Sequence, residues 1–148
     1  MVEVVIASAI ILSATLGLLG VHSLYLRTTL SNLNKVKATY LAEEGLEAMR
    51  YLRDVSWDSN IAALSLDTNY GVVLVGGSWQ ASTTATFVDG FQRVVKLSSV
   101  YRAPDGDIDS SGTTDPDTKL LSSSVSWAEY GTTTSRFIST YLTNLYDQ

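Results

Sequence analysis

Cysteine is absent from this chain of 148 residues, which excludes disulfides and thiolate metal sites. Proline is scarce, with only Pro104 and Pro116, whereas serine and threonine are abundant in the second half. Such a composition is typical of short strands joined by polar loops.

Positive charge is also in short supply, because 10 Lys and Arg face 15 Asp and Glu, for a net charge of −5. An acidic chain with scattered basic residues is unsuited to non-specific nucleic-acid binding, and no specific nucleic-acid partner is predicted. The single histidine, His22, lies in an apolar segment, and no base is placed to activate one of the serines. The carboxylates of Glu43, Glu44 and Glu47 are typical of a solvated helix face. The sequence therefore predicts a protein that is not an enzyme.

The most informative absence is that of formal charge between Val4 and Leu26. This segment has about 23 residues, and about 20 apolar residues suffice for a helix to cross the hydrocarbon of a bilayer. A secretory signal would open with Lys or Arg and have a shorter apolar core, but the opening residues here carry Glu3 instead. We expect the segment to lie in lipid, in a partner or in both.

Helical periodicity continues well beyond this segment, and one helix is predicted from about Val2 to about Asp54. It is apolar all round in its first half and amphipathic in its second half. We expect residues 1–27 to form a transmembrane or filament-core half and residues 28–148 to form a globular head. The apolar stripe expected to pack recurs at steps of three and four residues: Leu26, Leu30, Leu33, Val36, Tyr40 and Leu41, then Ala48, Met49, Leu52 and Val55.

Two glycines, Gly17 and Gly20, interrupt the apolar half of this helix. Each glycine in a helix interior costs about 1 kcal/mol relative to alanine. They indicate either close helix–helix approach in a membrane, where small residues lie at interfaces, or a weak point at which the helix can unwind.

Strand patterns follow a turn-rich connector after residue 54, and they predict an α+β fold in which a mainly antiparallel sheet covers the amphipathic stripe of the helix. A hairpin loop is expected at residues 128–134. The predicted strands are Val72–Val75, Trp79–Val88, Phe91–Val100, Leu120–Trp127 and Arg136–Leu145. Five aromatic residues are expected to fill the core and strands rather than to form a sugar- or base-stacking platform: Trp57, Tyr70, Trp79, Tyr101 and Trp127.

An acidic stretch separates two of these strands, and its carboxylates alternate in a way that lets them converge on one hard cation, calcium being the best match. The residues concerned are Asp105, Asp107 and Asp109, with Ser111 and with Asp115 or Asp117 to close the site. The glycine, however, is Gly112 rather than the residue after the third Asp, and no Glu closes the loop. A solvated acidic loop is favoured over a calcium site, and no other cofactor is predicted.

The opening Met-Val-Glu-Val-Val-Ile-Ala-Ser-Ala-Ile-Ile-Leu, followed by a long helix with Tyr-Leu-Ala-Glu-Glu-Gly-Leu-Glu-Ala-Met-Arg at residues 40–50, resembles type IV pilins and pseudopilins. The resemblance is specific over about the first 50 residues and loose afterwards. It implies that a leader peptide and two mature residues precede Met1. It also implies that Glu3 is the glutamate that pairs with the N-terminal amine of a neighbouring subunit. Gly20 takes the place of a helix-breaking proline, which favours unwinding.

The resemblance further implies a structural subunit of a type IV pilus, used for adhesion or twitching motility. Its partners would be copies of itself, the cytoplasmic membrane before assembly and the pilus assembly machinery. Two alternatives remain open: a minor pseudopilin of a secretion or DNA-uptake apparatus, and a non-polymerising, membrane-anchored extracytoplasmic binding module.

Overall fold

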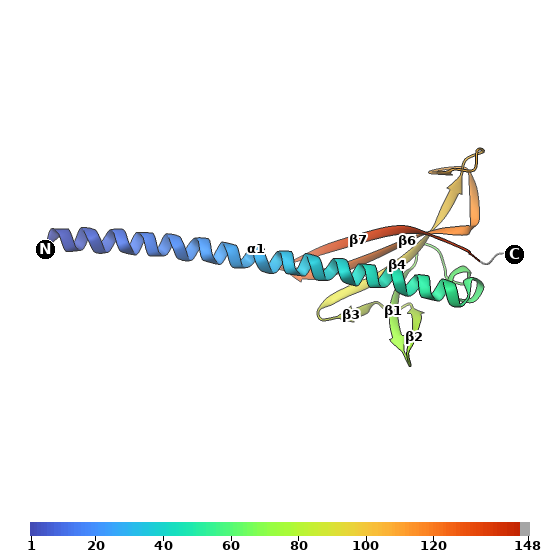
Figure 1. Ribbon diagram of the computed structural model, residues 1–148, viewed down its shortest axis with the longest axis horizontal. Coiled ribbons are helices and arrows are strands. Elements are labelled where there is room, and N and C mark those ends of the chain that lie inside the picture. Colours follow the sequence, from blue (N-terminus) through green and yellow to red (C-terminus); the bar gives the residue numbers. More distant parts are fainter. Residues whose placement is uncertain (146–148) are drawn as a thin grey trace. The chain divides into compact units, whose positions relative to one another are not determined.

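The computed structural model describes residues 1–145 and consists of one long helix followed by a seven-stranded antiparallel sheet (Figure 1). It divides into two compact units, Met1–Val36 and Lys37–Gln148, here called the N-terminal unit and the head unit. The α+β class and the antiparallel sheet predicted from the sequence are confirmed.

Helix α1 spans Val2–Val55, within one residue of the predicted end. No proline occurs in this range, and Ala, Leu, Glu and Arg, which are strong helix formers, are frequent in it. A short π-helical turn, η1 (Asp58–Ala62), follows and buries Ile61. The connector predicted as turns therefore contains one further helical turn before the sheet begins.

The strands form a sheet in the order β2-β1-β4-β6-β7, and β3 and β5 also pair with β4. The predicted stretch 79–88 contains two strands rather than one, and the strand predicted at 120–127 extends in both directions. The bounds are β1 Asn69–Val75, β2 Ser78–Ser82, β3 Thr86–Val88, β4 Phe91–Arg102, β5 Ile108–Asp109, β6 Thr113–Glu129 and β7 Thr132–Thr143.

Two tight turns set the register of the long strands. Asp89 and Gly90 join β3 to β4, and Tyr130 and Gly131 join β6 to β7. All four residues have positive φ, between 49° and 84°, which is the requirement of the two-residue hairpin turns that match strand twist. The loop predicted at 128–134 is thus shorter than expected, because both strands continue to the turn.

The core of the head unit lies between the sheet and the helical residues from Ala38 to Leu52. Alternate residues of β4 and β6 face this core, as strand periodicity requires. The buried residues of α1 are Ala38, Ala42, Gly45, Leu46, Ala48, Met49 and Leu52. The larger of the two buried clusters contains Leu46, Ala48, Met49, Leu52, Trp57, Ile61, Tyr70, Val72, Val95, Leu97, Leu121 and Leu142.

The predicted packing stripe of the helix was only partly right. Ala48, Met49 and Leu52 are buried and Leu41 is half-buried, whereas Leu26, Leu30, Leu33, Val36, Tyr40 and Val55 are exposed. Small residues rather than large ones occupy the first buried turns, because the helix approaches the sheet closely there. At Gly45, an added Cβ would lie 2.5 Å from Ser123 Oγ.

The sheet is interrupted where β4 and β6 lose their regular register, between Ser99 and Val100. Beyond this point the end of β4 and the beginning of β6 turn away from the rest of the sheet, together with β5 (Figure 1). We call these residues, 100–102, 108–109 and 113–115, the bent arm.

Candidate assembly site

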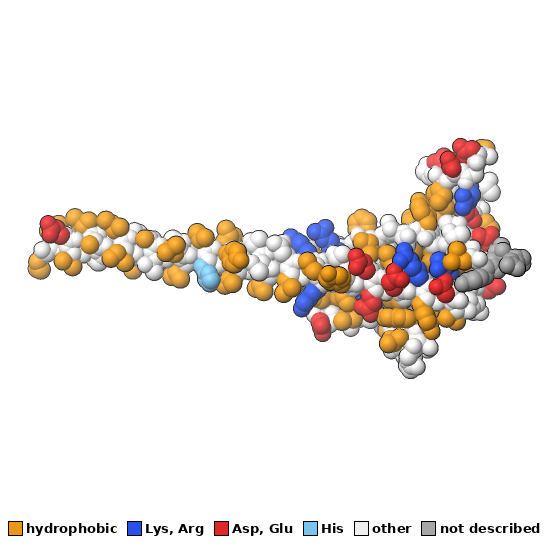
Figure 2. All heavy atoms as spheres, viewed as in Figure 1, with side chains coloured by type: hydrophobic (Ala, Val, Ile, Leu, Met, Phe, Trp, Pro, Cys, Tyr) orange, Lys and Arg blue, Asp and Glu red, His pale blue; other side chains and the backbone are white. Residues whose placement is uncertain are grey.

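The apolar residues of the N-terminal unit are exposed on all sides of α1. Ile6, Leu16 and Val21 keep 55%, 61% and 67% of their surface accessible. Figure 2 shows hydrophobic side chains along this segment, with the one histidine of the chain among them. Within residues 1–145, α1 is the one helix long and apolar enough to cross a membrane by length and composition. An exposed apolar surface of this extent is typical of sites that interact with a membrane or with another protein.

Glu3 lies in the first turn of α1 and is exposed. A carboxylate at this position is favourable for the helix itself, because the first turn carries unpaired N–H groups and the positive end of the helix dipole. It is the only acidic side chain among residues 1–42 of the sequence. Glu3 is therefore available to a cation that approaches from outside the chain.

Helix α1 continues without interruption through Gly17 and Gly20. A Cβ added at either position would meet no atom within 4 Å, so nothing in the head unit or the N-terminal unit requires a glycine there. Nearby hydroxyls are satisfied within the helix, since Ser13 Oγ donates to Ile10 O at 2.9 Å and Thr15 Oγ1 donates to Ile11 O at 2.8 Å. The segment is thus compatible with an apolar environment.

The acidic stretch does not form a common site. Asp105, Asp107 and Asp109 are exposed, as is Ser111. Asp115 and Asp117 lie in β6 rather than in a loop. Within the described residues, no group of three or more acidic or histidine side chains is placed to hold a metal ion.

Asp115 instead stabilises the bent arm. Its Oδ2 accepts a hydrogen bond from Arg102 Nε at 2.6 Å, and its Oδ1 accepts from the backbone N–H groups of Asp117 and Thr118. Arg102 also donates to Gly106 O at 2.7 Å. Burial acts to raise the pKa of Asp115, but these hydrogen bonds and the charge of Arg102 outweigh burial and hold the pKa below its ordinary value of 3.8.

Arg93 fastens the helix to the sheet within the head unit and is almost completely buried. Its guanidinium donates to Val72 O at 2.9 Å and pairs with Glu44 Oε2 at 2.9 Å. The guanidinium also lies 5.7 Å from the centre of the Trp79 ring. The strand predicted at residues 91–100 contains Arg93, but no role was predicted for this residue. The available signal was a charged residue in register with buried apolar neighbours.

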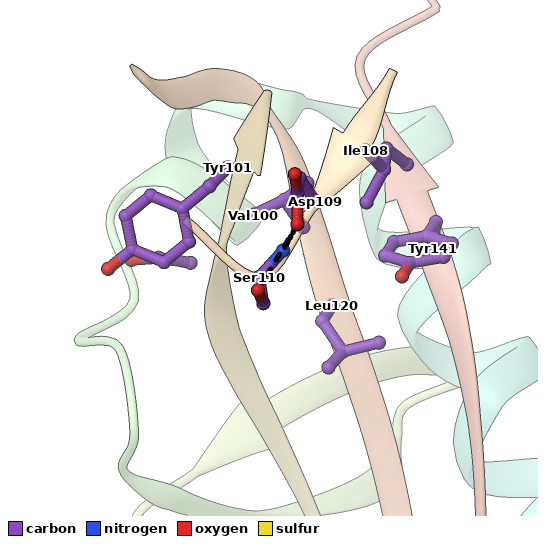
Figure 3. Close-up of a pocket in the computed structure, with 8 residues that line it drawn as sticks. Val100, Tyr101, Ile108, Asp109, Ser110, Leu120 and Tyr141 are labelled. Atoms are coloured by element: carbon purple, nitrogen blue, oxygen red, sulfur yellow. Dashed lines mark hydrogen bonds between the residues drawn. The ribbon is translucent and has the colours of Figure 1, made fainter. Parts of the chain in front are cut away.

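A groove of about 500 Å³ lies between the bent arm and the outer face of the sheet. Figure 3 shows Tyr101 and Tyr141 on opposite sides of Asp109 and Ser110, with Leu120 nearby. Tyr101 lies in a strand, β4, as predicted, but it does not fill the core, since 37% of its surface is accessible. The prediction holds for Trp57, Tyr70 and Trp127, which are buried, and in part for Trp79, which is half-buried.

Comparison of the chain with protein-family models, curated proteins and solved structures finds no match in any of the three.

Proposed function

We propose that this chain is a structural subunit of a type IV pilus, which polymerises through the apolar half of α1 into a cell-surface fibre used for adhesion or twitching motility. The observation that carries the proposal is an apolar helical segment, exposed all round, that bears a single carboxylate at its first turn. Before assembly, the same segment would hold the subunit in the cytoplasmic membrane, from which the assembly machinery takes it.

The carboxylate is the feature that separates a polymer from a simple anchor. A charged side chain at the centre of a bilayer helix costs about 3 kcal/mol, and the cost falls towards the headgroups. A simple anchor gains only the favourable position of Glu3 at the helix N-terminus, whereas a bundle of helices also gains an ion pair if a cation of the next subunit meets it. In the proposed filament this cation is the N-terminal amine of the neighbouring subunit.

The test is to replace Glu3 by Gln or Ala and to examine sheared cell-surface material by electron microscopy. We expect the wild-type chain to form helical fibres and both variants to lose most of them, while the subunit remains in the membrane fraction. Glu43→Gln is the matched control, because it removes a carboxylate from an exposed position of the same helix. It should leave fibre yield unchanged.

Two results would contradict the proposal. If the wild-type protein forms no fibres and disperses as monomer in detergent, the result supports a membrane-anchored binding module instead. If Glu3→Ala forms fibres at the wild-type yield, the carboxylate has no part in assembly.

A further inference from the structure

The groove beside the bent arm has the features of a built binding site. Its volume of about 500 Å³ falls within the range of small-molecule sites, about 300–1,000 Å³. Its walls come from different strands, with Tyr101 in β4, Asp109 in β5 and Tyr141 in β7. The groove therefore depends on the fold rather than on one flexible loop.

Exposed aromatic rings supply the apolar part of this groove. Tyr141 keeps 51% of its surface accessible and Tyr101 keeps 37%, although both belong to ordered strands. Leu120 is paired with Tyr141 in the register of β6 and β7, so the two side chains share the same face of the sheet. Tyrosine combines an apolar ring with a polar hydroxyl, and such rings suit ligands that are apolar on one face and hydroxylated at their edges.

Polar groups lie between the two rings. Ser99, Asp109 and Ser110 line the groove. Asp109 Oδ1 accepts hydrogen bonds from the N–H and the hydroxyl of Ser110, which orients the carboxylate. A carboxylate accepts hydrogen bonds strongly and donates none when ionised, so it selects ligands that carry O–H or N–H donors.

Charge excludes the other ligand classes that stack on aromatic rings. The lining includes one carboxylate and no Lys or Arg, and the whole chain has a net charge of −5. Nucleic acids and acidic sugars would meet repulsion without a compensating cation. An apolar peptide or lipid would leave the carboxylate desolvated and unpaired.

The bent arm forms one wall of the groove. Arg102 joins Asp115 and Gly106 across the arm, and Asp115 in turn accepts from the backbone of β6. A site that is already formed loses less entropy on binding than one that must be ordered. Arg102, which makes this ion pair, follows Tyr101 in β4, so we expect the pair to help hold Tyr101 beside the groove.

From these observations we infer that the groove binds a neutral saccharide, with Tyr141 and Tyr101 contacting the ring faces and Asp109 accepting hydrogen bonds from hydroxyl groups. The inference does not depend on polymerisation, since every residue of the site belongs to one head unit. If fibres do form, many weak sites on one fibre would gain avidity without any new contact.

The test uses the full-length chain in a phosphocholine detergent, because detergents with maltoside or glucoside headgroups would themselves be saccharides. The protein is cross-linked by an antibody into a multivalent complex and applied to an array of neutral glycans printed beside their sialylated forms. We expect binding to at least one neutral glycan, and a signal at least tenfold lower on its sialylated counterpart.

Variants then locate the site. Tyr141→Ala should lower the signal at least tenfold, whereas Tyr141→Phe should retain most of it. Asp109→Asn should lower the binding signal on the neutral glycan at least threefold. It should also narrow the difference in binding signal between neutral and sialylated glycans. Phe137→Ala is the matched control, because Phe137 is an exposed aromatic residue of the same strand and lies outside the groove. It should stay within twofold of wild type.

The inference is overturned if no neutral glycan on the array is bound, or if Tyr141→Ala and Phe137→Ala lower binding equally. It is also overturned if sialylated glycans bind as well as neutral ones. Proton NMR shifts of Tyr101 and Tyr141 that change with protein concentration in the absence of sugar would assign the groove to a second copy of the chain, and would overturn it too.

Discussion

At the scale of single residues, the contacts of Asp115 give the clearest prediction about the stability of the fold. Its carboxylate is buried in the bent arm and receives hydrogen bonds from one charged and two backbone donors. Because Asn keeps the shape but loses the charge, Asp115→Asn should lower the free energy of unfolding by about 1–3 kcal/mol, the usual range for hydrogen bonds to a charged group. Chemical denaturation at pH 7 measures this difference.

The depressed pKa of Asp115 also gives the sign of a pH effect. A carboxyl whose pKa is lower in the folded state stabilises the fold above its unfolded pKa, and this stabilisation is lost as pH falls through the folded value. The stability difference between wild type and Asp115→Asn should therefore shrink below about pH 4. Asp105→Asn, an exposed residue of the same stretch, is the control and should change little at any pH. A constant difference down to pH 2 would contradict the role assigned to the ion pair.

At the scale of elements, Gly45 lies at a close contact between α1 and the sheet. A Cβ there would lie 2.5 Å from Ser123 Oγ and 3.3 Å from Arg93 Cδ. Alanine gains about 1 kcal/mol in helix propensity, but overpacking of a close contact costs about 1–3 kcal/mol. We predict that Gly45→Ala is destabilising, with a net loss of up to about 2 kcal/mol in the free energy of unfolding, measured by denaturation in detergent.

Ser123 provides a double-mutant test of this contact. Its hydroxyl is buried without a hydrogen-bond partner within the described residues, so Ser123→Ala should be neutral or stabilising. If the clash with Oγ is the cause, Ser123→Ala should restore most of the stability lost in Gly45→Ala. Gly17→Ala is the control in the same helix, because a Cβ there meets no atom within 4 Å. Additive effects at Gly45 and Ser123 would contradict the explanation.

The helix shows what periodicity can and cannot predict. Its length followed from an apolar run that continues into a repeat of three and four residues, and the predicted end at Asp54 is one residue short. The face that packs was misjudged, because large apolar residues such as Leu30 and Leu33 were weighted above Ala38, Ala42 and Gly45. The close approach that selects small residues is a tertiary property and leaves little trace in hydrophobicity.

The strands and the candidate sites were predictable to a different degree. The strand predicted at residues 91–100 is observed as β4, in which alternate residues from Phe91 to Leu97 are buried. The irregularity after Ser99, at which the bent arm begins, has no local signal. The acidic stretch was predicted as a loop, solvated rather than metal-binding, although Asp115 belongs to β6 and pairs with Arg102. The groove was not predicted, because the sequence around Tyr101 has the pattern of a strand whether this side chain is buried or lines a groove.

At the scale of the whole molecule, the two units differ in how far their apolar side chains are exposed to water. The head unit buries its apolar residues between helix and sheet. The N-terminal unit leaves its apolar residues exposed, and its most apolar window has 0% of its residues buried. The head unit thus has a core of its own, whereas the chain supplies no cover for the apolar residues of the N-terminal unit in the structure. Substitutions in the two units should accordingly separate folding from assembly.

Gly17 and Gly20 allow this separation to be tested. Because neither is required by packing within the chain, the double substitution Gly17→Ala, Gly20→Ala should stabilise the helix of the monomer by about 1 kcal/mol per site. If the glycines serve close helix contact or local unwinding in the fibre, the same change should lower fibre yield severalfold. Circular dichroism of the monomer in detergent measures the first effect, and electron microscopy of sheared material measures the second.

Ser13→Ala is the control for this experiment, because it removes a hydroxyl from the same segment without adding bulk, and Ser13 bonds only to its own helix at Ile10 O among the described contacts. It should leave both helicity and fibre yield near the wild-type values. Fibres at full yield from the double alanine variant would mean that the glycines have no part in assembly. A fall in both helicity and yield would instead place their role in the monomer, against the open space around them in the structure.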